Sequence, residues 1–450
     1  MLSAIFFIFT FLATVTLAIR ETVVYIFVLY QAYYFFNPST KWWGSNIPDI
    51  RFSFYIVLTL LVIAALNWVK LKDNKILAIP QFIFMFITAA LYYIASFYAV
   101  LPAVHSIALD AVLTITVLVA IVYKIVQTEK HLDIILKGYV IFAGYLGYYV
   151  SQFGRTTDGR FEGAGMVDSP DANGLGAALA PAVVISLFYF WNSKNWLVKL
   201  FFGLICIYLA NSLVQIGSRG AFLGVFFSCS VFIWVLYFSK LQSKNQRKSA
   251  IALVFIGLIG AAMVTDSAFW NRMATIKTSN LEAASEKESG STRVYFWLAA
   301  IDMAKDHPFG NGASGFIYYA PYYIPDSIDT GKSRNRAVHS TWFEVLSEIG
   351  YLGAISFSGM IFYSFVTIFR TTKVLQAQNK SEQYFKVIAI GCGLFCFVIS
   401  MTFLNRFRAE ILYWLVLYTA VAYNIYVLKS TEKMTGLNSS SVKLSSDLVP

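Results

Sequence analysis

The sequence predicts an all-α, polytopic integral membrane protein, and three observations support this fold class. Hydrophobic residues make up 58% of the 450 residues and charged residues 13%, whereas soluble domains carry roughly 25% charge. Apolar stretches of about 17 to 25 residues, the length that crosses a bilayer as a helix, recur along the chain. Stretches such as 60–69 and 82–100 have no polar face. Because backbone groups in lipid must be satisfied within the segment, these stretches are predicted to be helices.

Thirteen apolar segments are candidate membrane spans. In chain order they are 2–19, 22–36, 53–69, 76–100, 103–123, 134–150, 173–191, 197–216, 220–239, 250–265, 342–369, 387–404 and 409–428. The first two are short and only Arg20 and Glu21 separate them, so they could form one broken unit. The predicted number of spans is therefore twelve or thirteen.

Basic clusters lie in every second loop between these segments and account for much of the net charge of +11. They are Lys70/Lys72/Lys75, Lys124/Lys130, Lys194/Lys199, Lys240/Lys244/Arg247/Lys248, Arg370/Lys373/Lys380/Lys386 and Lys429/Lys433. Cytoplasmic loops of membrane proteins carry such an excess of lysine and arginine. Membrane orientation therefore accounts for the positive charge, and we expect no nucleic-acid partner. The loops 37–52, 151–172, 266–341 and 405–408 are then expected to face outward.

This orientation divides the chain into four predicted regions. Residues 1–265 form the N-terminal membrane helices with the outer loops 37–52 and 151–172. Residues 266–341 form a large outer loop with a helix near 290–306, and residues 342–428 form the C-terminal membrane helices. The polar, Ser-rich tail 429–450 is predicted to be disordered and cytoplasmic. No internal repeat is evident, which disfavours transporter folds built from repeated halves.

Several chemistries leave no signature in the sequence. The four cysteines, at positions 206, 229, 392 and 396, all lie within apolar segments and show no metal-ligand spacing. No GxxxxGK[ST] loop, GxSxG elbow, HExxH motif or EF-hand occurs. The sequence therefore predicts neither an ATPase, a serine hydrolase nor a zinc protease, and no metal or other cofactor is expected.

Arg219 is the first candidate site residue. It lies between glycines in Gly217-Ser218-Arg219-Gly220, at the outer end of two apolar segments. A guanidinium at this position can donate two parallel hydrogen bonds to a phosphate, and glycines let backbone amides approach the same anion. The alternative is an arginine whose charged end reaches the membrane surface from a helix terminus.

Two further candidates lie in or beside the large loop. Arg293 stands in the first turn of the predicted helix near 290–306, where a cation is unfavourable for the helix dipole. His339 lies just before the next membrane helix, where a neutral imidazole can accept a proton from a hydroxyl. Thr341 and Glu344 fit a capping box that starts this helix, and Glu344 could instead orient the imidazole. Solvated loop residues are the alternative in each case.

Other outward-facing arginines could form an electropositive cavity that attracts a diphosphate. Arg155 and Arg160 belong to the loop 151–172, and Arg336 precedes His339. Lys332, Arg334, Arg406 and Arg408 add to the same charge. In the loop 151–172, Ser169 or Asp171 is predicted to cap the following helix, with a proline close to its first position.

The order of these motifs resembles the O-antigen ligase and polymerase superfamily over about residues 150–370. The resemblance is carried by Gly-Ser-Arg-Gly at 217–220, by Arg293 with Trp297, by His-Pro-Phe-Gly-Asn-Gly at 307–312, and by His339-Ser-Thr-x-Phe-Glu with Glu348, Gly350 and Gly353. Tyr-Tyr-Phe-Phe-Asn-Pro at 33–38 and Arg-Met-Ala-Thr-Ile-Lys-Thr at 272–278 look like a narrower branch, the O-glycosylation ligases associated with exosortase systems.

The resemblance implies a GT-C-like glycosyltransferase in the bacterial inner membrane, with its active site facing the periplasm. Such an enzyme transfers a glycan from an undecaprenyl-diphosphate carrier to an acceptor hydroxyl, without a metal and with inversion at the anomeric carbon. The acceptor would be lipid A-core, a protein or another glycan. Arg219 and Arg293 would then hold the diphosphate, and His339 would activate or orient the acceptor.

Three other readings stay open from the sequence. A polymerase would run the same chemistry with a second glycan as the acceptor. A transporter of lipid-linked glycans would also use about twelve helices and a basic cavity, although few charged residues lie mid-span. A purely structural membrane protein would have little use for the costly outward arginines.

Overall fold

The computed structural model describes residues 2–431 apart from 49, 156–158, 162, 164, 165, 167, 170, 242–244, 275–291, 329, 331 and 332. All regular secondary structure within these residues is helical. The α-helices are α1 Leu2–Arg20, α2 Val24–Phe36, α3 Phe52–Leu66, α4 Pro80–Ala95, α5 Pro102–Ile125, α6 Glu129–Phe153, α7 Ala172–Asn192, α8 Trp196–Ile216, α9 Arg219–Phe238, α10 Gln246–Val264, α11 Ser267–Ala274, α12 Thr292–Asp306, α13 Gly315–Tyr323, α14 Thr341–Ala377, α15 Ser381–Met401 and α16 Glu410–Tyr423. The predicted all-α membrane fold is thus confirmed.

Ten of the described helices are long and apolar enough to cross a membrane. The helix α16 reaches this length because a π-helical turn, Asn424–Leu428, continues it to Thr431. Each of the thirteen predicted segments contains a helix, but three of these helices are shorter than the rest. They are α2, α3 and α4, with 13, 15 and 16 residues.

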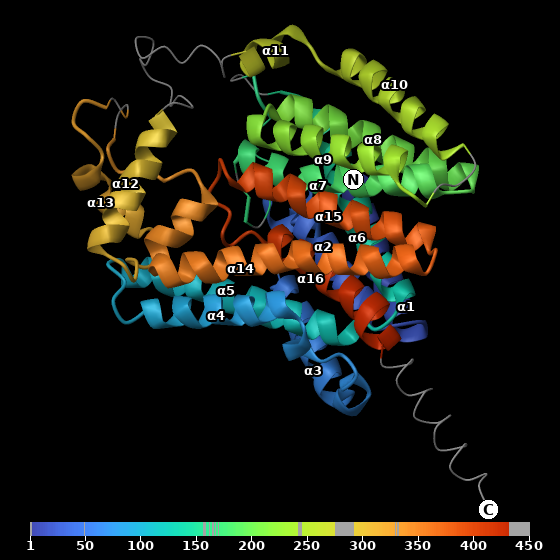
Figure 1. Ribbon diagram of the computed structural model, residues 1–450, viewed down its shortest axis with the longest axis horizontal. Helices are drawn as coiled ribbons and strands as arrows, with labels where there is room; N and C mark the ends of the chain where they lie inside the picture. Colours follow the sequence, from blue (N-terminus) through green and yellow to red (C-terminus); the bar gives the residue numbers. More distant parts are fainter. Residues whose placement is uncertain are drawn as a thin grey trace, which may run out of the picture.

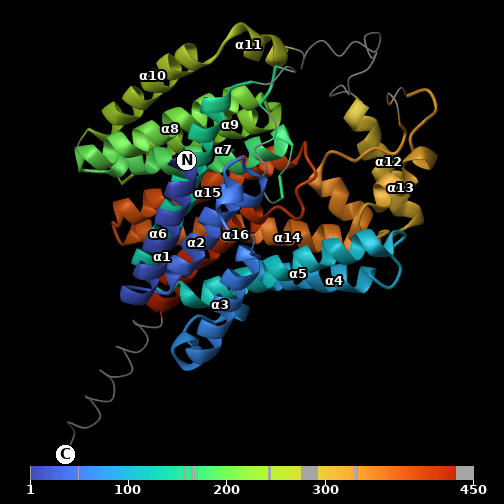
Figure 2. The ribbon, with the colours of Figure 1, turned by 180° about the vertical axis from the view of Figure 1, so that it is seen from behind.

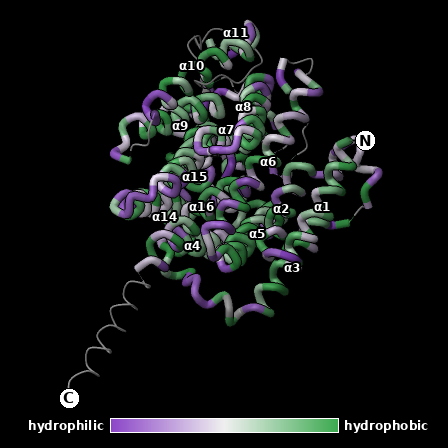
Figure 3. Tube along the Cα trace, turned by 90° about the vertical axis from the view of Figure 1, so that its right-hand side faces the viewer, coloured by the Kyte–Doolittle hydropathy of each residue, from purple (hydrophilic) through white to green (hydrophobic). Residues whose placement is uncertain are grey.

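The helices form one bundle with a buried centre and a loosely attached flank (Figures 1 and 2). The most apolar window of α16 is 83% buried inside the bundle, whereas that of α10 is 11% buried. Figure 3 shows hydrophobic positions along most of the bundle helices. A lipid-facing surface accounts for the exposed apolar side chains of α10, because hydrocarbon replaces the protein core as their partner.

The helices α12 and α13 lie together at one end of the bundle, beside the start of α14 (Figure 1). They share a small apolar core of their own, formed by Phe296, Ala299, Ala300, Met303, Phe316, Ala320, Ile324 and Val338. We call this end the α12–α13 end. The predicted helix near 290–306 is confirmed as α12, whereas residues 275–291 and the predicted tail 432–450 lie outside the described residues.

Several of the predicted basic loops meet at the opposite end of the bundle. The Lys130 ammonium pairs with Glu21 at 3.1 Å, and Lys386 pairs with Glu129 at 3.1 Å. The Lys429 ammonium donates to the carbonyl of Gln127. Asp168 of the 151–172 loop and Arg406 of the 405–408 loop lie instead near the start of α14.

A break inside α14 fixes how this end is built. Gly350 has φ +65° and Ile349 departs from helical angles, so α14 consists of two helices with a kink between them. The amides of Asn311 and Gly312 donate to the carbonyls of Ser347 and Glu348, both at 2.9 Å. The His-Pro-Phe-Gly-Asn-Gly motif and the Glu-x-Gly motif are therefore packed against each other, although about forty residues separate them in the sequence.

Two capping predictions have different outcomes. Asp171 caps α7 as predicted, because its carboxylate accepts from the amides of Asn173 and Gly174 at 2.9 and 3.0 Å. The predicted capping box at the start of α14 is wrong, because the Thr341 hydroxyl donates to the carbonyl of Leu404 and Glu344 accepts from the amide of Phe407. Both side chains are used to hold the neighbouring loop instead.

Candidate active site

The loop between α15 and α16, residues 402–409, organises the candidate site. The Arg293 guanidinium, on the first turn of α12, donates to the carbonyl of Phe403 at 3.1 Å. The Ser340 amide donates to the Asn405 side chain at 3.1 Å, and the Thr341 hydroxyl donates to the Leu404 carbonyl at 2.7 Å. The start of α12 and the start of α14 are thus tied to consecutive residues of one short loop.

Arg219 reaches the same place from another helix. Gly217 ends α8 in the left-handed conformation, φ +61°, and Arg219 is the first residue of α9. A side chain at Gly220 would lie 3.4 Å from the carbonyl of Ser400 and 3.7 Å from the Phe403 ring, so α9 begins in contact with the end of α15. The compact Gly-Ser-Arg-Gly turn therefore puts Arg219 beside the residue that binds Arg293.

A third arginine joins these two. The Arg272 guanidinium, on α11, donates to the carbonyl of Gly217 at 2.7 Å. Arg272 and Arg293 are both close enough to Arg219 to act on its charge. We call Arg219, Arg272 and Arg293 the arginine cluster. Like charges repel, so an anion bound among them would stabilise the arrangement, and guanidinium groups suit phosphate oxygens.

His339 precedes the start of α14, which is tied to the same 402–409 loop that binds Arg293. It adopts φ +51°, a left-handed conformation that is uncommon outside glycine. The following residue, Ser340, is held by Asn405, two residues from the Phe403 carbonyl that binds Arg293. The backbone of His339, a partly buried residue, is therefore held where α14 begins beside the 402–409 loop.

Glu344 does not orient the imidazole through any hydrogen bond of the described residues but forms part of a buried ion triad. The Arg408 guanidinium donates to Glu344 at 3.0 Å and to Glu348 at 2.6 Å. The Tyr92 hydroxyl donates to Glu348 at 2.9 Å and accepts from Arg408 at 2.9 Å. Burial lowers the pKa of Arg408, but the two carboxylates outweigh burial and hold that pKa well above its ordinary value.

The other predicted arginines lie around this site with partners of their own. Arg155 forms a two-point ion pair with Asp266, at 2.5 and 3.0 Å, and the hydrogen bond from Arg155 lowers the pKa of this aspartate. Arg160 donates to the carbonyl of Ile216, next to the α8–α9 turn, and to the Asn173 side chain. Arg336 donates to the carbonyl of Thr330. Lys332 lies outside the described residues.

Arg406 links the 151–172 loop to the site. Its guanidinium pairs with Asp171 and donates to the carbonyl of Asp168 at 3.1 Å. Burial raises the pKa of Asp171, but Arg406 and the amides of Asn173 and Gly174 outweigh burial and hold it below its ordinary value. The N-cap of α7 is thereby locked to the 402–409 loop.

A polar cavity of about 220 Å³ lies beside the 402–409 loop, and Val338, the residue before His339, is part of its lining. Its lining combines three carboxylates and two arginines with an amide, a hydroxyl and a few apolar groups. The lining residues are Asp168, Ser314, Phe316, Ile317, Val338, Glu344, Glu348, Asn405, Arg406, Arg408 and Ala409. We call this the mixed-charge cavity.

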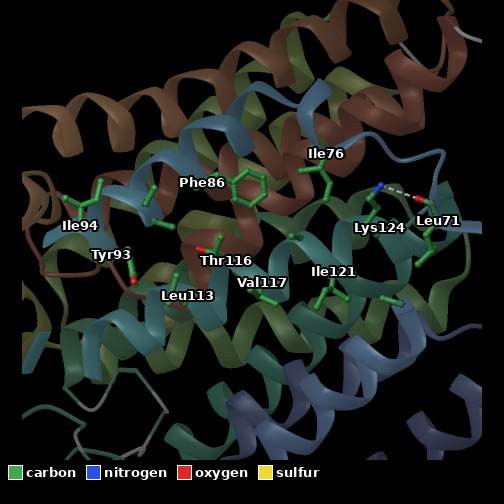
Figure 4. Close-up of a pocket in the computed structure, with 14 residues that line it drawn as sticks. Leu71, Ile76, Phe86, Tyr93, Ile94, Leu113, Thr116, Val117, Ile121 and Lys124 are labelled. Atoms are coloured by element: carbon green, nitrogen blue, oxygen red, sulfur yellow. Dashed lines mark hydrogen bonds between the residues drawn. The ribbon is translucent and has the colours of Figure 1, made fainter. Parts of the chain in front are cut away.

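A larger cavity, of about 670 Å³, lies elsewhere, between α4 and α5. Figure 4 shows apolar side chains such as Phe86, Leu113 and Val117 around it, with Lys124 at one end. Lys124 donates to the carbonyl of Leu71 at 3.4 Å. This apolar cavity offers neither an anion-binding cluster nor a histidine, so the chemistry is better placed at the α12–α13 end.

The fold and this site define a class: a polytopic α-helical membrane protein with an arginine-rich site at one end of its bundle. Residues 204–358 match the model of the O-antigen ligase family. This match supports the O-antigen ligase superfamily that the sequence motifs predicted, and the narrower exosortase-associated branch stays a prediction. No curated protein matches the chain. The superfamily implies a glycosyl-transferring enzyme that works on lipid-linked glycan within a membrane.

Sequence reasoning missed two parts of this site. In the sequence, Arg272 is recognisable only as part of a branch motif, because its place beside Arg219 depends on the packing of α11 against the α8–α9 turn. The sequence predicts that Arg408 adds outward positive charge, whereas in the structure Glu344 and Glu348 neutralise it. The spacing of these two glutamates, four residues apart on one helix face, was the available signal for a shared cationic partner.

Proposed function

We propose that the chain transfers a glycan from a polyprenyl-diphosphate carrier, of the undecaprenyl type, to an acceptor hydroxyl at the periplasmic face of the bacterial inner membrane. The observation that carries this proposal is the convergence of Arg219, Arg293 and His339 on the 402–409 loop. Three distant parts of the sequence thus bring two arginines and a histidine towards one short loop, which supports a shared role for them. The superfamily match supports the same reaction class.

In this proposal the arginine cluster binds the diphosphate of the donor. The bond between the anomeric carbon and the phosphate oxygen breaks as negative charge develops on that oxygen. Preorganised guanidinium groups in a site shielded from water stabilise this charge. We include Arg272 with Arg219 and Arg293 in this role, since all three surround the α8–α9 turn.

His339 acts on the acceptor. The attacking hydroxyl must lose its proton as the new glycosidic bond forms, and a neutral imidazole can accept that proton. Direct displacement would invert the configuration of the anomeric carbon. Arg155, Arg160, Arg336 and Glu344 are proposed to support the site through the 151–172 loop, the 330–340 segment and the ion triad.

In vitro transfer tests the proposal. Purified protein is incubated with undecaprenyl-diphosphate glycan and candidate acceptors in the presence of EDTA. We expect wild-type transfer, with losses of roughly a hundredfold or more in Arg219→Ala, Arg293→Ala and His339→Ala, the scale for removing one transition-state contact. Arg247→Ala, an exposed arginine outside the site, serves as the matched control.

The products separate the related readings. Single transferred units on lipid A-core or protein indicate a ligase, whereas a ladder of repeat units on glycan indicates a polymerase. Transfer that survives in His339→Ala with a normal amount of folded protein would refute the assignment of the base. Movement of the lipid-linked glycan across a vesicle membrane without any new linkage would favour the transporter.

A further inference from the structure

The mixed-charge cavity has hydrogen-bonding groups that its own ion pairs leave unused. The Asn405 side-chain oxygen accepts from Ser340, but its amide nitrogen has no partner among the described residues. The Ser314 amide donates to Glu348 at 3.1 Å, while its hydroxyl makes no hydrogen bond within the described part of the chain. The lining carboxylates keep lone pairs that can still accept. A ligand that both donates and accepts hydrogen bonds would satisfy these groups.

The charge of the cavity also indicates its ligand. Asp168, Glu344 and Glu348 line the cavity together with Arg406 and Arg408. Arg408 binds Glu344 and Glu348, and Arg406 pairs with Asp171 just outside the lining. A diphosphate placed here would meet three carboxylates, whereas the arginine cluster offers it only cations. The cavity is therefore suited to a neutral group, and hydroxyl groups are neutral donors and acceptors.

The volume and the lining of the cavity restrict the class of ligand further. The cavity of about 220 Å³ compares with a share of roughly 30 Å³ for one water molecule in the liquid, so it admits a group of the size of one sugar ring. Phe316 and Ile317, from α13, line it beside the polar groups. A sugar ring carries both hydroxyl groups and an apolar C–H face, so it can use both kinds of lining.

The 402–409 loop lies between this cavity and the arginine cluster. Phe403 in the loop binds Arg293 of the cluster, whereas Asn405, Arg406, Arg408 and Ala409 line the cavity. His339 follows Val338, which lines the cavity, and precedes Ser340, whose amide donates to the side chain of Asn405. The cavity and the arginine cluster thus flank one short loop, to which the residue after His339 is bound.

We infer that the mixed-charge cavity binds a neutral sugar ring of the acceptor and places its hydroxyl at His339. This inference rests on the proposed function, because the reacting hydroxyl attacks the anomeric carbon of the donor. The oxygen–carbon bond to the acceptor forms, and the carbon–oxygen bond to the diphosphate breaks. The hydroxyl proton passes to the imidazole, and the electron pair leaves with the diphosphate.

A binding experiment tests the cavity without requiring transfer. Saturation-transfer NMR is recorded for methyl hexosides and methyl N-acetylhexosaminides with purified protein. Ile317→Trp fills the cavity from α13 and leaves the ion pairs in place. We expect the sugar signal to fall by about fivefold or more in this variant, because steric exclusion costs on the order of 1 kcal/mol or more.

Two further variants control the result. Tyr318→Trp changes the next residue of α13, which is exposed and does not line the cavity, and should keep the wild-type signal. Ser314→Ala removes only the unused hydroxyl and should weaken the signal about twofold to tenfold, the effect of one lost hydrogen bond. This milder change keeps the test valid if the tryptophan disturbs folding.

The opposite results would overturn the inference. A sugar signal that persists fully in both Ile317→Trp and Ser314→Ala would place sugar binding elsewhere. Displacement of the sugar by inorganic pyrophosphate in wild type, but not in Arg219→Ala, would assign the cavity to the donor diphosphate. Absence of any hexoside signal in wild type would also contradict it.

Transfer kinetics distinguish a failure of this inference from a failure of the proposed function. Once an acceptor is known, Ile317→Trp should raise the acceptor KM by about tenfold or more while the donor KM changes by less than about twofold. Equal effects on both KM values would contradict a dedicated acceptor cavity. If wild type binds hexosides but performs no transfer, the proposed function fails and the sugar site stands.

Discussion

Replacement of Arg408 by leucine should destabilise the protein strongly. The Arg408 side chain is 27% exposed, and its partners Glu344 and Glu348 are 5% and 4% exposed. Loss of the cation leaves two buried carboxylates without the guanidinium that binds both of them. Removing one partner of a buried ion pair typically costs about 3 to 5 kcal/mol, and the two remaining partners of Glu348, Tyr92 and the Ser314 amide, offset only part of this cost.

The magnitude can be measured by titration with SDS in mixed micelles. Unfolding is followed with a thiol-reactive dye, because Cys392 and Cys396 are buried in the folded protein. We expect Arg408→Leu to lower the free energy of unfolding by about 3 kcal/mol or more. Lys130→Met is the matched control, since the Lys130–Glu21 pair is 71% and 41% exposed and such pairs contribute about 0 to 1 kcal/mol.

A compensated variant sharpens the test. Combining Arg408→Leu with Glu344→Gln and Glu348→Gln removes all three formal charges, so much of the lost stability should return. A cost below about 1 kcal/mol for Arg408→Leu, the value of a surface pair, would refute the reasoning. Failure of the neutral triple variant to recover any stability would show that packing of the guanidinium, not its charge, is what matters.

Three further predictions concern the backbone, the donor and pH. Gly350→Ala should lower the free energy of unfolding by about 1 to 3 kcal/mol, because Gly350 has φ +65° and an added Cβ would meet backbone atoms of the His-Pro-Phe-Gly-Asn-Gly motif. Gly257→Ala is the control, because Gly257 on α10 has open space around it. This variant should leave the free energy of unfolding unchanged or raise it by up to about 1 kcal/mol. Arg272→Ala should raise the donor KM about tenfold and leave the acceptor KM unchanged, as expected for one lost phosphate contact. The pKa of Asp171 in the folded protein is held below its ordinary value of 3.8. The ion pair of Asp171 therefore stabilises the fold fully above pH 3.8, and this stabilisation is lost as the pH falls through the folded-state pKa. Below pH 3.8 the melting temperature of wild type should fall towards that of Asp171→Asn.

Each of these predictions has an outcome that would contradict it. Equal stability of Gly350→Ala and Gly257→Ala would mean that the kink of α14 accepts a residue with a Cβ at position 350 without strain. An acceptor KM that changes with Arg272→Ala would separate this residue from the donor. A difference between Asp171→Asn and wild type that persists unchanged to the lowest pH would show that the charge of Asp171 is not involved.

The helices could be predicted from the sequence because lipid imposes a simple rule. An apolar stretch long enough to cross a bilayer must satisfy its backbone within itself, so each of the thirteen segments became a helix. The cap at Asp171 was also predictable, since it needs only amides two and three residues away. The capping box at Thr341 and Glu344 was not, because partners in the 402–409 loop compete for the same side chains.

The sequence by itself determined the fold class, the superfamily motifs and the residue types that could bind an anion or accept a proton. Only the tertiary structure decided which of these residues meet. Arg219, Arg272 and Arg293 are separated by tens of residues, and side-chain direction depends on how their helices pack. The partners of Arg408 were also decided by packing: its sequence neighbours offer no acidic group in direct pairing with it, whereas in the fold two glutamates bind it. Local composition cannot encode such pairings, because a charge takes the partner that three-dimensional packing brings to it.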